Sequence, residues 1–119
     1  FPGGRTLGAA KIVHVEATGK NGAALQKFYS EAFDWKLDTS NPGGYGMHRD
    51  DNGMTAGVGA TQDGSDGAVT FYVHVEDAAA TLKHIEALGG TIVMPLTEVA
   101  PETTIALFAD PAGHVVGLM

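Results

Sequence analysis

The stretch Lys11-Ile12-Val13-His14-Val15-Glu16-Ala17 alternates apolar and polar side chains, and a near copy, Phe71-Tyr72-Val73-His74-Val75-Glu76-Asp77, returns about halfway down the chain. Alternation with a period of two predicts a half-buried strand in each copy. In the first copy the valines share one face, whereas His14 and Glu16 share the other. One face is therefore expected to pack against a core, and the other to meet a ligand or carry chemistry.

Each copy is followed by the same order of predicted elements. A helical apolar stripe follows the first strand over 24–33, where Asn21 is placed to cap it, and a second helix begins at the cap residue Asp77 and stops at Gly89-Gly90. Turn signals then separate three short strands in each half. These strands are predicted at 35–38, 45–49 and 54–60, and at 91–94, where Pro95 is expected to end the strand, 103–108 and 114–119.

The repeat predicts an α+β fold made of two tandem βαβββ modules, residues 11–61 and 68–119, joined by the polar connection 62–67. Neither module is large enough to bury a core alone, so their sheets are expected to pair or to curl around a shared space. The expected product is an incomplete eight-stranded barrel with its helices outside, forming one domain over 11–119. Residues 1–10 are interpreted as a lead-in or an expression remnant.

Composition narrows the classes of function. The chain has 119 residues, no cysteine and a net charge of −7, and no Lys/Arg cluster that would attract a nucleic acid or an anionic membrane surface. No apolar run approaches the roughly 20 residues that cross a bilayer. The sequence therefore predicts a cytoplasmic protein with neither nucleic-acid nor membrane partners. It contains no nucleophile-elbow or P-loop motif, which disfavours hydrolase and nucleotide-binding functions.

Four motifs in order resemble the vicinal oxygen chelate superfamily, which includes glyoxalases, bleomycin resistance proteins and dioxygenases. They are the doubled βαβββ order, Phe28-Tyr29 followed by Phe33-Asp34-Trp35, Leu88-Gly89-Gly90, and Phe108-Ala109-Asp110-Pro111-Ala112-Gly113. The resemblance covers Lys11 to Met119. It implies a glyoxalase-like half-barrel whose concave face binds a small organic molecule, often around one divalent metal, and often as a homodimer.

The resemblance also implies where metal ligands would lie. Its four ligand positions fall on His14, Gly57, Thr70 and Gly117 of this sequence, and only His14 is a usual ligand. A divalent ion held by a single imidazole would be lost to solvent. The site is therefore predicted to be altered and metal-poor, with His14 as the one retained metal position and a divalent metal left open as a cofactor.

Two sets of site residues follow. His14 and Glu16 are the predicted catalytic pair, with a structural polar face as the alternative reading. Tyr72, His74, Thr70 and Gly57 are predicted to contact the ligand; His74 lies four residues beyond Thr70, the position equivalent to His14, so the second His-Val-Glu is not a symmetry mate. A further group could wall a pocket or simply form core: Trp35, Tyr45, Met47 and Met54.

Three functions remain open. The first is a glyoxalase-like protein that binds a small molecule without a metal in the usual position. The second is a metal-dependent lyase, isomerase or dioxygenase with a rearranged site formed by His14, Glu16 and His74. The third is a drug-sequestering protein of the resistance type, which needs an apolar groove and no catalytic group.

Overall fold

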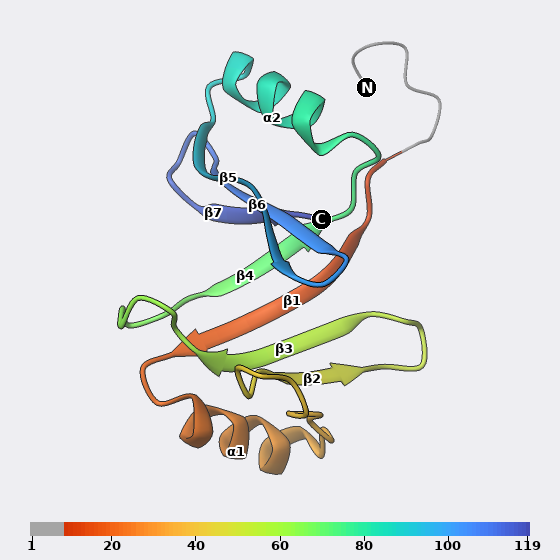
Figure 1. Cartoon of the computed structure of the whole chain (residues 1–119), viewed down its shortest axis with the longest axis vertical. Helices are drawn as coiled ribbons and strands as arrows, with labels where there is room; N and C mark the ends of the chain where they lie inside the picture. Colours follow the sequence, from red (N-terminus) through yellow and green to blue (C-terminus); the bar gives the residue numbers. More distant parts are fainter. Residues whose placement is uncertain (1–8) are drawn as a thin grey trace. The chain divides into compact units, whose positions relative to one another are not determined.

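The computed structural model describes residues 9–119, so residues 1–8 of the predicted lead-in lie outside the described part. The chain divides into two compact units, one comprising 13–70 and the other 71–119 together with the described residues before 13. Both units combine one helix with a mixed sheet, as the predicted α+β class requires (Figure 1). No helix within 9–119 is long and apolar enough to span a membrane.

In the unit 13–70, β3 is the central strand. It runs parallel to β1 and antiparallel to β2, and α1 packs against it (Figure 1). Ala56 and Val58, two apolar residues of β3, are buried, while Gly57 and Gly59 alternate onto the other face. The elements are β1 (Ile12–Gly19), α1 (Gly22–Phe33), β2 (Gly46–Arg49) and β3 (Thr55–Ala60).

Helix α1 begins as predicted, because Asn21 Oδ1 accepts a hydrogen bond from the Ala24 amide at 3.0 Å. Its contact with the sheet differs from the predicted apolar stripe. Gly22 packs closely against Ala60, whereas Phe28 and Phe33 remain 61% and 58% exposed. The helix therefore approaches β3 through a small residue at its start, and part of its aromatic stripe faces outward.

The strand predicted at 35–38 is reduced to a single bridge between Asp38 and Met47, so the described residues form seven strands where the sequence analysis expected eight. The Asp38 carboxylate instead accepts hydrogen bonds from the amide and hydroxyl of Ser40. Asn41 then closes the following turn through two hydrogen bonds to the Tyr45 backbone. Local side-chain bonds of this kind compete with strand pairing.

The second unit buries its own core. Leu82 of α2, Ala106 of β6 and Leu118 of β7 form a buried cluster, and within this unit the strands follow the order β4-β7-β6-β5. Its elements are β4 (Val69–Val73), which begins at the end of the first unit, α2 (Ala78–Ala87), β5 (Thr91–Ala100), β6 (Thr103–Ala109) and β7 (Val115–Leu118).

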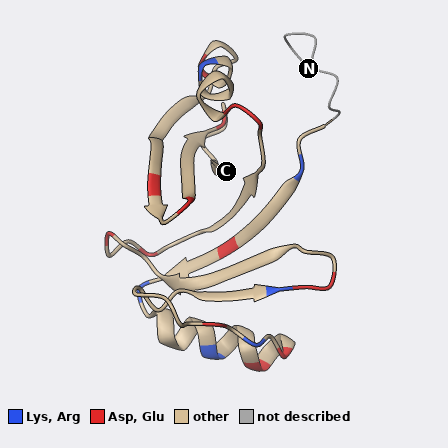
Figure 2. Cartoon of the chain, turned by 45° about the vertical axis from the view of Figure 1, so that its right-hand side comes forward, with Lys and Arg blue, Asp and Glu red and all other residues tan. Residues whose placement is uncertain are grey.

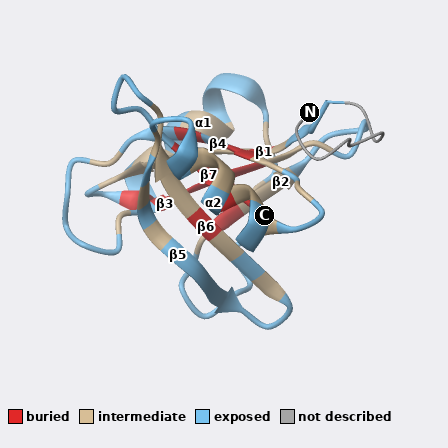
Figure 3. Cartoon of the chain, turned by 90° about the horizontal axis from the view of Figure 1, so that it is seen from above, coloured by how far each residue is buried: buried red, intermediate tan, exposed pale blue. Residues whose placement is uncertain are grey.

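Strand β5 continues past Pro95 to Ala100, although the sequence predicts that it ends at Met94. The register with β6 shifts between Met94 and Thr97, and a proline is tolerated at such an irregularity because no ladder amide is needed there. Val93, Leu96 and Val99 are 51%, 41% and 53% exposed, consistent with the largely exposed ribbon of β5 (Figure 3).

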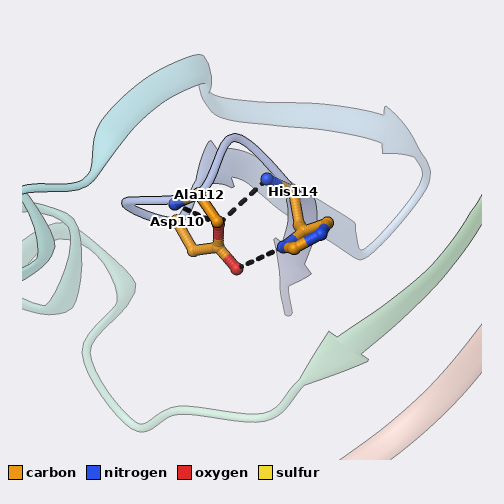
Figure 4. Close-up of polar contacts among 3 residues, drawn as sticks. All are labelled: Asp110, Ala112 and His114. Carbon is orange, nitrogen blue, oxygen red and sulfur yellow. Dashed lines mark hydrogen bonds and ion pairs between the residues drawn. The ribbon is translucent and has the colours of Figure 1, made fainter.

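The predicted turn before the last strand is confirmed. The Gly113 amide donates to the Asp110 carbonyl at 2.8 Å, and Asp110 Oδ1 accepts from the amides of Ala112 and His114, each at 2.9 Å (Figure 4). His114 Nδ1 lies 3.0 Å from Asp110 Oδ2. His114 thus serves the turn.

Replacing Asp77 with alanine is expected to destabilise the protein by about 1 kcal/mol, because the Asp77 side chain caps α2 by accepting from the Ala80 amide at 3.0 Å. Asp77→Asn keeps an oxygen at that position and is the matched control, with an expected change of a few tenths of a kcal/mol. Urea unfolding measures both variants. Equal losses in the two would show that the side-chain cap does not hold the helix start.

Candidate functional site

One face of the sheet in the unit 13–70 gathers polar side chains around His14. The parallel register places His14 beside Thr55 and Glu16 beside Gly57. Residues two apart on a strand share a face, so the paired polar residues of β1 and β3 lie together, and Tyr45, just before β2, reaches over them. The opposite face carries the apolar residues of β3 that pack under α1.

His14 is buried, at 7% exposure, and both of its ring nitrogens are engaged. Nδ1 lies 2.5 Å from Thr55 Oγ1, and Nε2 lies 3.0 Å from the Tyr45 hydroxyl. Tyr45 in turn donates to Glu16 Oε1 at 2.8 Å. The side chains therefore form a chain, Thr55–His14–Tyr45–Glu16, in which Glu16 reaches the imidazole through a tyrosine hydroxyl.

The protons in this chain constrain one another. Thr55 Oγ1 also donates to the Val13 carbonyl at 3.2 Å, and each hydroxyl carries one proton. If Tyr45 donates to Glu16 and Thr55 donates to Val13, both nitrogens of His14 must carry hydrogens. A neutral imidazole requires one of the two hydroxyl groups to rotate and donate to the ring. The Thr55 hydroxyl can do so by giving up its long hydrogen bond to the Val13 carbonyl and donating to His14 Nδ1.

Burial lowers the pKa of His14 below its ordinary value, and the nearby Glu16 carboxylate opposes this shift by raising it. The net lowering favours the neutral ring at neutral pH. With Thr55 donating to Nδ1, the neutral ring donates from Nε2 to Tyr45, which keeps the chain directed towards the carboxylate. The arrangement therefore couples the protonation of His14 to the orientation of Thr55.

Stability is expected to fall as pH decreases through about 6.5, because an unfolded histidine, with its ordinary pKa near 6.5, takes up a proton before the buried His14 does. The unfolded chain then binds more protons, so the free energy of unfolding declines towards the folded-state pKa. Urea unfolding across this range measures the slope. His14→Gln should flatten it; an equal slope in the variant and in wild type would contradict the assignment.

Tyr45 fills the space above Gly57. A Cβ at Gly57 would lie 1.6 Å from the Tyr45 hydroxyl, and one at Gly59 would lie 3.0 Å from the Tyr45 ring. The sequence predicts a ligand contact at Gly57; in the structure the Tyr45 side chain lies over this residue. Glycine is thus needed at position 57 for Tyr45 to reach His14 and Glu16.

The other unit repeats this pairing of a tyrosine with a glycine. Tyr72, 5% exposed, lies opposite Gly117 in the register of β4 and β7, and a Cβ at Gly117 would lie 2.2 Å from the Tyr72 ring. Each of the two glycines that occupy implied metal-ligand positions is therefore covered by an aromatic side chain of its own unit.

The remaining predicted residues lie as follows. Thr70 is buried on β4, at 9% exposure, within the unit 13–70. His74 follows the end of β4 and is exposed; its Nδ1 lies 3.1 Å from the Met119 carbonyl. Within 13–70 the structure brings His14, Glu16 and Gly57 together around Tyr45.

A divalent metal on His14 does not fit the donors present in the unit 13–70. Both His14 nitrogens already contact hydroxyls, so coordination would break one of these bonds, and the position of Gly57 offers a tyrosine ring instead of a carboxylate. No three His, Asp or Glu side chains within 9–119 converge as a metal-binding group. The polar side chains around His14 bind one another through hydrogen bonds instead of converging on a metal ion.

A shallow pocket of about 360 Å³ lies beside this chain of side chains. The pocket shares Thr55 with the His14 network. A molecule that contacts the Thr55 hydroxyl in the pocket would therefore be linked to the imidazole through that hydroxyl. Figure 2 shows a basic position at the end of β2 followed by an acidic turn, and Arg49 at that end of β2 is one of the pocket residues. The pocket is lined by Asp38, Met47, His48, Arg49 and Thr55.

Two residues of the site are not identified by the sequence pattern. The sequence indicates Tyr45 only as a pocket wall or core residue, and nothing in it marks Thr55 as part of a site. The register that pairs His14 with Thr55 joins strands separated by a helix and a long loop, and period-two alternation does not reveal it. The glycines of β3 were the available signal, since they marked a close approach by another group.

Comparison with known proteins agrees with this fold. The model of the Glyoxalase/Bleomycin resistance protein/Dioxygenase superfamily matches residues 11–118. The anthracycline biosynthesis protein DnrV of Streptomyces peucetius is 32% identical over 109 residues, covering 76% of this chain and 40% of that protein. The chain spans 40% to 45% of the length of the curated relatives DnrV and CFP32.

Solved structures show the same fold at low identity. A superfamily member from Vibrio splendidus 12B01 superposes with a TM-score of 0.63 at 17% identity, covering 92% of this chain and 97% of that one. A methylmalonyl-CoA epimerase variant from Streptomyces coelicolor gives 0.60 at 14% identity, covering 91% and 94%. The predicted glyoxalase-like fold is confirmed, and the chain belongs to the glyoxalase/bleomycin resistance protein/dioxygenase superfamily.

Proposed function

We propose that this chain is a small-molecule-binding member of the superfamily that works without a divalent metal in the usual position. The observation that supports the proposal is the engagement of both His14 nitrogens by Thr55 and Tyr45. Tyr45 stands over Gly57, where a family carboxylate ligand would be implied. The ligand would enter the pocket beside Thr55, and Thr70, Tyr72 and His74 stay proposed ligand contacts.

Two measurements test this proposal. The metal content of protein purified without chelator is expected to be far below one equivalent, for wild type and for His14→Ala alike. Stoichiometric metal that disappears in His14→Ala would overturn the metal-free part. The second is a thermal-shift screen with dicarbonyls, thiol conjugates and planar antibiotics, in which a ligand at 100 times its dissociation constant stabilises by about 2.7 kcal/mol. A screen without any shift would count against binding.

The relatives support including planar antibiotics in that screen. DnrV is named for anthracycline biosynthesis, so an aromatic small molecule, bound or processed, is a reasonable class for this chain to share. Sequestration and conversion both start from such binding. A homodimer, a cytoplasmic location and a single domain over 11–119 are also proposed, and sedimentation equilibrium tests the first of these.

A catalytic role for His14 and Glu16 is the second candidate. The observation in its favour is the chain from Glu16 through Tyr45 to His14, whose lowered pKa suits a general base near neutral pH. A base of this kind would exchange an acidic C–H of a bound ligand with solvent. Deuterium incorporation in heavy water, followed by NMR on hits from the screen, should occur with wild type and be lost in His14→Gln; hits without exchange would restrict the chain to binding.

A further inference from the structure

Three rings in the unit 13–70 are stacked nearly parallel. Tyr29 of α1 and Trp35 lie with centroids 5.8 Å apart and planes at 11°, and Trp35 and His48 of β2 lie 5.4 Å apart at 8°. Parallel rings at these separations are the offset-stacked arrangement that aromatic groups prefer. The stack runs from the helix to the sheet and has Trp35 at its centre.

His48 is the end of this stack, and it also lines the 360 Å³ pocket. Because Trp35 covers one face of the His48 ring, the pocket meets the edge or the other face of that ring. A flat molecule in the pocket could therefore extend the stack. Met47 adds a polarizable thioether to the lining, and sulfur contacts with aromatic rings are favourable.

The polar lining carries charges of both signs. The Asp38 carboxylate accepts from Ser40 and can accept further, while Arg49 uses Nη1 to donate to the Gly53 carbonyl at 3.2 Å and has further N–H groups. A charged ligand would be attracted by one of these and repelled by the other. A neutral aromatic ligand with a hydroxyl group can donate a hydrogen bond to Asp38, and the Arg49 guanidinium can form a cation–π contact with the face of the ligand's ring.

We propose that this pocket is a subsite for a neutral, planar aromatic molecule bearing a hydroxyl group, which stacks on His48 and lies between Asp38 and Arg49. This inference rests on the proposed small-molecule function and names its ligand class. The hydroxyl of Thr55, which lines the same pocket, places the bound ring next to the His14 network.

Calorimetric titration with 2-naphthol and with decahydro-2-naphthol tests the inference, since the two share a hydroxyl and differ in aromaticity. The saturated compound is bulkier and more apolar, so burial alone would favour it. The subsite predicts the reverse, with 2-naphthol binding about five- to tenfold tighter. Trp35 is the single tryptophan of the chain, so its fluorescence should change on 2-naphthol binding and little with the saturated analogue.

Substitutions at His48 and Arg49 test whether the preference for 2-naphthol comes from stacking on His48. His48→Ala should remove the preference for 2-naphthol, His48→Phe should restore it, and Arg49→Gln should weaken 2-naphthol binding about threefold. The controls His114→Ala and Lys83→Gln remove a histidine and a basic side chain in the other unit and should bind as wild type does. Circular dichroism melting checks that each variant folds.

The outcomes separate this inference from the function on which it rests. Equal or tighter binding of decahydro-2-naphthol, or an unchanged preference in His48→Ala, would overturn the subsite while leaving small-molecule binding intact. Shifts with the dicarbonyl or thiol-conjugate panel but no binding of 2-naphthol would do the same. If neither naphthol nor any panel member binds, both the subsite and the proposed function fail.

Discussion

Gly67→Ala is expected to destabilise the protein by about 3 to 4 kcal/mol, the largest effect of any single substitution considered for this chain. Gly67 has φ of +87°, and a Cβ there would lie 1.9 Å from the Thr18 carbonyl oxygen. Two costs combine: backbone strain of about 1 kcal/mol for a residue with a side chain, and a clash with backbone atoms that cannot rotate away. The Thr18 amide also donates to the Ala68 carbonyl at 3.0 Å, so the clash falls where the connection is fastened to β1.

Gly64→Ala is the matched control, because Gly64 has φ of +74° and a Cβ there would meet nothing within 4 Å. It shares the strain and lacks the clash, so its expected cost is about 1 kcal/mol. Urea unfolding of both variants separates the two contributions. Equal losses would mean that the segment moves away from Thr18 without cost.

Gly57→Ala is expected to cost about 2 to 3 kcal/mol, because the new methyl group takes the place of the Tyr45 hydroxyl. Displacing that hydroxyl also breaks its contacts with His14 and Glu16. In a Tyr45→Ala background the three atoms nearest to the methyl group are absent, so the same substitution should then cost less than about 1 kcal/mol. The difference between the two backgrounds measures the steric coupling.

Gly43 provides a control position because it has room for a side chain. Gly43→Ala, where the nearest atom to a new Cβ is Asn41 Oδ1 at 3.8 Å, should change stability by no more than about 0.5 kcal/mol. The His14 imidazole resonances, followed by NMR, should shift in Gly57→Ala and not in Gly43→Ala. Additive losses for Gly57→Ala and Tyr45→Ala would show that Tyr45 does not occupy that position.

Much of the fold follows from local patterns. Both helix starts were predicted because Asn21 and Asp77 precede apolar periodicity, and the last turn because Asp110 and Gly113 have the required spacing. The failures have two different causes, one local and one nonlocal. The segment at 35–38 lost its strand to local bonds around Ser40, and β5 passed Pro95 because its register with β6 is irregular there.

The site was predicted only in part, because one of its residues, Tyr45, comes from an irregular loop. Alternation identifies His14 and Glu16 as one polar face, but the loop that carries Tyr45 is irregular and its path depends on Asn41. The sequence therefore indicates that another group approaches Gly57 closely, but it does not identify that group as Tyr45. The resemblance placed the implied metal positions, and the structure adds that tyrosines cover both glycines.

The irregular β5 has a consequence for behaviour at high concentration. It is the last strand in the order of its unit, and a long apolar strand in that place would invite another chain to add to it. Pro95 withholds one amide, and the register shifts break the regular row of donors and acceptors. Fibril-like growth from this strand is thereby disfavoured, even though Val93, Leu96 and Val99 remain exposed along it.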